Sequence, residues 1–284
     1  MRIKKPASPK KTGGSVNVRL ELSKPYCLPG EEIGCTLVIR TQRPIRYKAI
    51  SAELTCCEKF FINGSRLTRI PHKHVVRVSG PGTALPPRTS LYFTMAIPSE
   101  AKPTYLGSSI LRVWRVRTFL EFGLAPNIAV EEDLLIISSI DREGQRSAHA
   151  CRGPLRLEIT LKKGLFLPGE ALKGHVFLSH PLAIRSLRVE LFAIEKLCIE
   201  RFGEVSLTRC LRRAFLPVKK MAFFSLQAPS YSPFVDICSS AIYVLRAVAS
   251  LRAEGELVAD LPISIGVLRT ARPRRHHITS EGGY

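Results

Sequence analysis

The chain has 284 residues, of which 45% are hydrophobic and 23% charged, a composition that is typical of globular proteins and excludes an intrinsically disordered chain. No apolar run approaches the roughly 18 to 20 residues that a spanning helix needs, and the basic N-terminus lacks the apolar stretch of a signal peptide. The formal charge of +20 favours contact with anionic surfaces without naming one.

Much of the excess charge lies in two tails, residues 1–15 and residues 269–284, which we expect to be flexible. Their cations are candidates for contact with an anionic surface, with acidic lipid a better candidate than nucleic acid because surface aromatics for base stacking are lacking. These candidates are Lys4, Lys5, Lys10, Lys11, Arg272, Arg274 and Arg275.

Residues 16–140 carry the pattern of a β-sandwich. Short runs rich in Val, Ile, Leu, Thr and Phe recur at intervals of roughly 8 to 12 residues, divided by Pro and Gly. Asn63-Gly64, between two such runs, predicts a hairpin with a type I′ turn. No stretch keeps helical periodicity for three turns, so we expect an all-β fold.

Pro29-Gly30-Glu31 predicts a tight turn between two strands. Proline fixes φ near −65° and glycine tolerates a positive φ. The glutamate can accept hydrogen bonds from free backbone N–H groups of the turn. We expect a structural role for these residues and for their counterparts Pro168, Gly169 and Glu170.

The strand around Trp114 contains the candidate partner-binding residues, Arg115 and Arg117. Both share one face because side chains of a strand alternate with a period of two. Trp114 has more apolar area to bury and should claim the opposite, core-facing side. We expect the two arginines to be substantially exposed on the open face of the first sandwich.

Residues 141–153 are polar and lack periodicity, which indicates a linker, and residues 154–268 then repeat the first part of the chain. Leu167-Pro168-Gly169-Glu170 repeats Leu28-Pro29-Gly30-Glu31. Residues 44–59 align without a gap on residues 181–196, and the identical pairs include Glu53 with Glu190 and Glu58 with Glu195. The matched blocks keep their order, so the sequence predicts two tandem, immunoglobulin-like antiparallel β-sandwiches.

The duplicated order of a Pro-Gly-Glu turn, a strand of the Val-Glu-Leu kind and a later Pro-x-Phe/Tyr element resembles the arrestin superfamily. The last element is Pro103-Thr104-Tyr105, and its counterpart is Pro233-Phe234. The resemblance implies two arrestin-type sandwiches, joined as a scaffold that binds other proteins and sometimes acidic lipid. The chain departs from phosphoreceptor-sensing arrestins, because residues 252–259 leave room for only a short turn where those proteins have a long loop.

No catalytic fingerprint is present: Gly-x-Ser-x-Gly, P-loop and dinucleotide-binding motifs are all missing from the sequence. His72 and His74 share a strand face but lack an evident third metal ligand. The eight cysteines show no zinc-type spacing and are expected to be buried small apolar residues. The chain has only three Asn and three Gln, and such scarcity is a trait of hyperthermophile proteins. Because intracellular proteins of hyperthermophiles can contain disulfides, it stays open whether any of the cysteines pair.

Together these observations predict a non-enzymatic cytoplasmic adaptor that binds protein partners, without cofactor, metal or small-molecule substrate. The alternative is a peripheral binder of anionic lipid that uses the basic tails.

Overall fold

The computed structural model describes residues 16–62, 64–123, 126–199, 203–236 and 239–268, and the tail cations proposed above lie outside these ranges. The described residues form strands, turns and one short 3-10 turn, Pro181–Ala183. The predicted all-β fold is therefore confirmed. Its sheets are antiparallel except for three short parallel pairings, β2 with β11, β15 with β22 and β12 with β23.

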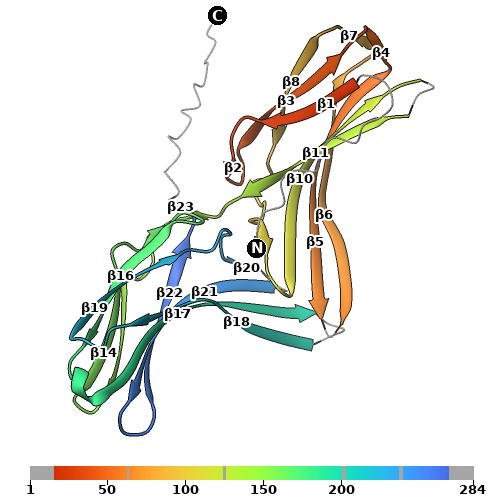
Figure 1. Ribbon diagram of the computed structural model, residues 1–284. Coiled ribbons are helices and arrows are strands. Elements are labelled where there is room, and N and C mark those ends of the chain that lie inside the picture. Colours follow the sequence, from red (N-terminus) through yellow and green to blue (C-terminus); the bar gives the residue numbers. More distant parts are fainter. Residues whose placement is uncertain (1–15, 63, 124–125, 200–202, 237–238, 269–284) are drawn as a thin grey trace, which may run out of the picture.

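Two sheets, here called the first-half sheets, face each other in the first part of the chain (Figure 1). The smaller sheet has the order β1 (Val16–Leu22), β3 (Glu32–Thr41), β8 (Arg88–Ala96). The larger sheet has the order β2 (Tyr26–Cys27), β11 (Ile128–Ile136), β10 (Ile110–Glu121), β5 (Ala49–Ile62), β6 (Ser65–Ser79), and β9 (Tyr105–Leu106) pairs with β10. A separate ribbon joins β4 (Ile45–Tyr47) to β7 (Gly82–Ala84).

The second-half sheets repeat this arrangement with one more strand in the smaller sheet. The smaller has the order β13 (Ser147–Arg152), β14 (Leu155–Leu161), β16 (Ala171–Leu178), β19 (Met221–Gln227). The larger has the order β15 (Leu165–Phe166), β22 (Glu256–Ile265), β21 (Ser239–Leu251), β17 (Ile184–Ile199), β18 (Gly203–Leu216), with β20 (Phe234–Val235) beside β21. A short pair links the two parts, β12 (Ser139–Ile140) with β23 (Val267–Leu268).

The repeated turn occupies the same strand connection in both halves, between β2 and β3 and between β15 and β16. Gly30 has φ 79° and Gly169 has φ 76°, values that favour glycine. In the first turn the carboxylate of Glu31 accepts a hydrogen bond of 2.9 Å from the Leu28 N–H. Glu170 accepts the same bond, also 2.9 Å, from the Leu167 N–H. The sequence therefore predicted both the position of these turns and the task of their glutamates.

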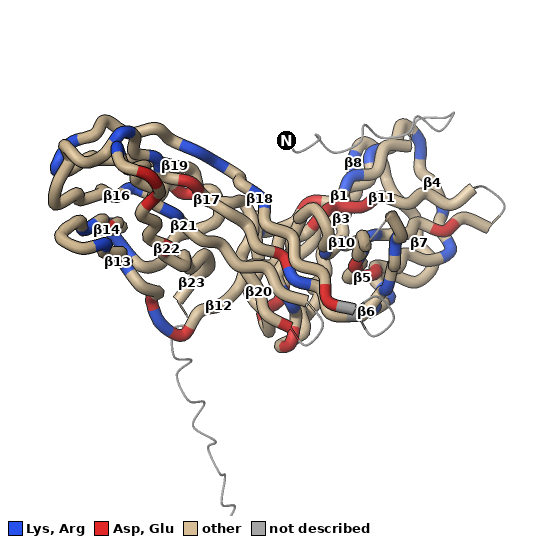
Figure 2. The backbone as a smooth tube through the Cα atoms, turned by 90° about the horizontal axis from the view of Figure 1, so that it is seen from below, with Lys and Arg blue, Asp and Glu red and all other residues tan. Residues whose placement is uncertain are grey.

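The alternation of buried and exposed side chains along the strands determines where the hydrophobic cores lie. Along β10 every second residue is buried, and Trp114 is only 3% exposed. The largest core cluster is built from second-half residues, but it continues into Phe60, Ile62, Tyr105 and Ile110 of the first half. The first-half and second-half sheets thus share apolar packing where they meet. Figure 2 shows them at opposite ends of an elongated molecule, with β6 and β18 near the middle.

Two local expectations need correction. Residues 147–152, expected in a linker, form β13, which pairs antiparallel with β14. Ala148 and Ala150 pack against the core from this strand, and so few small apolar residues give too weak an alternation to predict it. Of the seven cysteines in the described part of the chain, all are free, and Cys151, Cys198 and Cys210 are exposed, against the expected burial.

Candidate functional site

The two arginines predicted to bind a partner point away from the core on β10, but their guanidinium groups already have anionic neighbours. The side chains of Arg115 and Arg117 are 36% and 42% exposed. Arg115 binds Asp133 at 2.8 Å, and Arg117 binds Glu131 at 2.6 Å, across the β10–β11 pairing. The side chains are half-exposed and ion-paired, so they offer less free positive charge than the sequence suggested.

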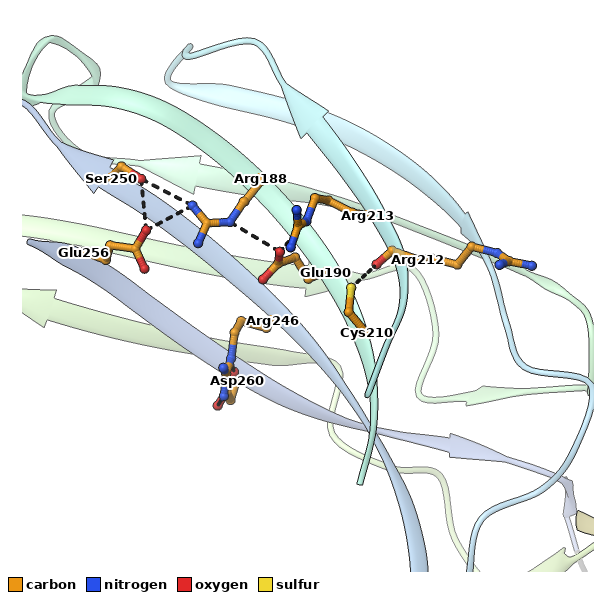
Figure 3. A network of polar contacts seen from close by, with 9 residues as sticks. All are labelled: Arg188, Glu190, Cys210, Arg212, Arg213, Arg246, Ser250, Glu256 and Asp260. Atoms are coloured by element: carbon orange, nitrogen blue, oxygen red, sulfur yellow. Dashed lines mark hydrogen bonds and ion pairs between the residues drawn. The ribbon is translucent and has the colours of Figure 1, made fainter. Parts of the chain in front are cut away.

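The second half carries the same kind of charged row (Figure 3). On β21, Arg246 forms two hydrogen bonds of 2.7 Å with Asp260 of β22. The neighbouring strand supplies Glu190, which lies opposite Arg246 and forms an ion pair with Arg213 of β18. Glu53 occupies the matching position in β5, opposite Arg117. The two glutamates that the duplication aligned therefore lie at equivalent places in the two large sheets.

The hydrogen bonds that Arg246 donates to Asp260 raise the pKa of Arg246. Each row alternates in sign across neighbouring strands, an arrangement that stabilises a sheet by modest amounts because surface pairs contribute about 0–1 kcal/mol. A ligand would have to displace carboxylates that are already in place. The charged rows therefore act first as parts of the sheets.

A buried charged group lies where the two halves meet. Arg112 of β10 is fully buried and binds Glu58 of β5, which is 1% exposed. Glu58 also binds Arg69 of β6. The guanidinium of Arg112 lies over the ring of Phe234, from the second half, with its central carbon 4.4 Å from the ring centroid. A buried charge is tolerated only when it is paired, and this cluster supplies the pairing.

The second buried carboxylate, Glu195 of β17, is held by the first half. It accepts a 3.1 Å bond from the Tyr105 hydroxyl and a 3.0 Å bond from the Ser108 N–H. Ser109 donates twice, from its N–H at 2.7 Å and its hydroxyl at 2.6 Å. Burial opposes ionisation of Glu195, but these donors outweigh it and lower the pKa of the carboxyl.

Sequence reasoning missed this junction although it carried a signal: Glu58 and Glu195 were an identical pair in the duplication. Their partners differ, because Arg112 lies opposite Glu58 whereas Ala241 lies opposite Glu195. The cation of the first half thus has no counterpart in the second, and donors from residues 105–109 take its place.

The histidines and cysteines form no metal site in the described part of the chain, and one of the cysteines, Cys56, is buried. Across the described residues, no group of three His, Cys, Asp or Glu side chains is placed to hold a metal ion. His72 instead packs on Trp114, with ring centroids 5.5 Å apart. Burial raises the pKa of Cys56 to about 12, which keeps its thiol protonated and unreactive at neutral pH.

Two strands have the features of an interaction surface. β8 and β19 each form one edge of a small sheet, opposite the edge formed by β1 or β13, and neither has a sheet partner on its second side among the described strands. β19 has no charged residue, and β8 has only Arg88 at its start. Tyr92 of β8 is 69% exposed and Phe223 of β19 is 70% exposed.

The two exposed aromatics occupy equivalent positions. Tyr92 lies opposite Thr36, five residues after Glu31 of the first turn, and Phe223 lies opposite His175, five residues after Glu170 of the second. By contrast, β6 has Pro71 and a register shift, features that protect an edge from further pairing. The small sheets therefore end on regular, almost uncharged strands that repeat one exposed aromatic.

A scan against models of known protein families found no match for this chain, and no curated protein matched it in a sequence search. Within the described ranges, no helix has the length and apolar character needed to cross a membrane.

Proposed function

We propose that this chain is a non-enzymatic, arrestin-like adaptor of the cytoplasm that binds protein partners as extended segments along β8 and β19. The observation that carries the proposal is the repetition of a regular, nearly uncharged open edge strand with an exposed aromatic. Natural sheets usually protect such edges with charges, prolines or bulges. An edge left open can receive a partner strand through backbone hydrogen bonds.

The repeated strand order of the large sheets and the repeated Pro-Gly-Glu turn support the arrestin-like assignment. Glycine at a positive φ and a glutamate that closes the turn recur in the same strand connection. The rigid sheets would hold the two edges as fixed templates, so specificity would come from side chains that flank them. On β19 these include Met221 and Phe223, which point out from the same face.

Selection from a displayed library of random short peptides tests the proposal with the full chain as bait. Selected peptides should bind as strands and slow amide hydrogen exchange in β8 or β19. Tyr92→Lys with Phe223→Lys should weaken their binding by tenfold or more, since a charge at an edge opposes strand addition.

Phe215→Lys is the matched control, because Phe215 is also exposed (74%) but lies on β18, next to a register shift and several arginines. It should leave binding unchanged. Peptides that bind the double variant as tightly as the unaltered chain would rule out these edges as the docking sites.

A further inference from the structure

One end of the first-half sheets gathers cations without acidic neighbours in its loops. The β3–β4 and β7–β8 connections lie at this end, and residues 40–48 and 80–90 contain no Asp or Glu. Figure 2 shows Lys and Arg segments beside β4 and β8. The exposed cations of this basic end are Arg40, Arg43, Arg46, Lys48 and Arg88.

Two of these arginines face each other directly. Arg40 of β3 and Arg88 of β8 are register partners in an antiparallel pair, which brings Cβ atoms to about 5 Å. Like charges at this spacing destabilise a sheet. No member of the basic end forms an ion pair with an acidic side chain in the described part of the chain. External anions would relieve this repulsion, whereas the arginines of β10 and β21 have carboxylates of their own.

An apolar side chain projects from the same end. Leu85 follows β7 and is 58% exposed, and Pro86 and Pro87 after it are exposed too. Its position is fixed: the Thr89 hydroxyl accepts a 2.8 Å bond from the Leu85 N–H and donates a 3.2 Å bond to the Leu85 carbonyl. The protein thus holds an exposed leucine at the basic end, three residues before Arg88.

Exposed cations at the same end as an exposed leucine fit the boundary between lipid headgroups and acyl chains. Cations near an anionic bilayer gain about 1 kcal/mol each, and a buried apolar group adds to that. Binding to duplex nucleic acid would leave the leucine without an apolar contact, and the nearby Tyr47 is buried and therefore cannot stack on a base. β1 begins at Val16, opposite Thr41, so the basic segment 1–15 joins the fold at this end too.

We propose that the basic end of the first-half sheets docks on membrane surfaces that carry anionic phospholipids, with Leu85 entering the interface. This docking site lies at the loops of one end, whereas the proposed peptide-binding edges run along β8 and β19; among its cations only Arg88, at the start of β8, belongs to an edge strand.

The test is flotation of the full chain with vesicles made of equal parts phosphatidylserine and phosphatidylcholine, and with vesicles of phosphatidylcholine alone. Binding should require phosphatidylserine and weaken with salt. Arg40→Ala, Arg43→Ala and Arg46→Ala together should reduce the partition coefficient about 100-fold, at roughly fivefold per charge. Leu85→Ser should reduce it about tenfold and leave much of the salt dependence.

The matched control replaces three exposed cations of the second half with alanine, Arg185, Arg209 and Arg252, so its net charge changes by the same amount. Because these residues lie outside the basic end, the control should bind within about threefold of the unaltered chain. Equal losses in both triple variants, or loss only on deletion of residues 1–15, would overturn the proposal. The proposal would also be overturned if the triple variant lost binding to a DNA duplex but bound vesicles as well as the unaltered chain does. The triple variant should still bind the edge-selected peptides, which separates this result from the adaptor hypothesis.

Discussion

Replacing Glu195 with alanine removes the one acceptor that four donors of the first half share. These donors are the Tyr105 hydroxyl, the Ser108 N–H, and the N–H and hydroxyl of Ser109. Tyr105 and Ser109 are buried, at 2% and 6% exposed. An orphaned buried donor costs about 1–3 kcal/mol, and water entering the vacated space satisfies some donors, so we expect a loss of about 3–5 kcal/mol.

Urea unfolding at neutral pH measures this loss. Lys196→Ala is the matched control, because Lys196 is the next residue on β17 and is exposed; its loss should stay within about 0.5 kcal/mol. A loss below about 1 kcal/mol for Glu195→Ala would contradict the account of a carboxylate that ties the two halves together.

The same carboxylate gives a pH dependence with a definite sign. Because its donors lower the pKa of Glu195 in the folded state, the ionised carboxylate stabilises the protein fully above the ordinary glutamate pKa near 4.3. That stability is lost as the pH falls through the folded-state pKa. The stability difference between the unaltered chain and Glu195→Gln should therefore shrink on acidification below about pH 4, and a constant difference would refute the reasoning.

Two further substitutions test other parts of the charge arrangement. Arg115→Ala with Arg117→Ala should reduce the free energy of unfolding by less than about 1 kcal/mol, measured by thermal unfolding, because both ion pairs are half-exposed. Weaker binding of peptides or vesicles would make this face part of a docking surface. Unchanged binding would leave it an ordinary solvated face. Arg112→Leu should cost about 3–5 kcal/mol by urea unfolding, because it leaves the buried Glu58 with only the more exposed Arg69; a loss within 1 kcal/mol would mean that Glu58 is neutral in the folded protein.

Local chemistry accounts for what the sequence predicted well. The two-residue period placed Trp114 in the core, and proline, glycine and glutamate at fixed offsets specified the turn after Leu28 down to its hydrogen bond. The role of Glu195 could not be predicted, because its hydrogen-bond donors lie 86 to 90 residues away along the chain. Sequence patterns relate residues only over short spacings. The strand β13 was not predicted for another reason: only two alanines pack on the core from it, so its sequence shows little alternation of apolar and polar residues.

The duplicated halves differ where they touch, and the difference has a physical consequence. Glu58 finds its cation within its own sheet, whereas Glu195 depends on donors from the other half of the chain. A buried carboxylate without partners would cost several kcal/mol, so separating the halves would expose or neutralise Glu195 while Glu58 kept Arg112. Phe60 and Ile62 add apolar packing to the same junction. The junction therefore opposes movement of one half of the chain against the other.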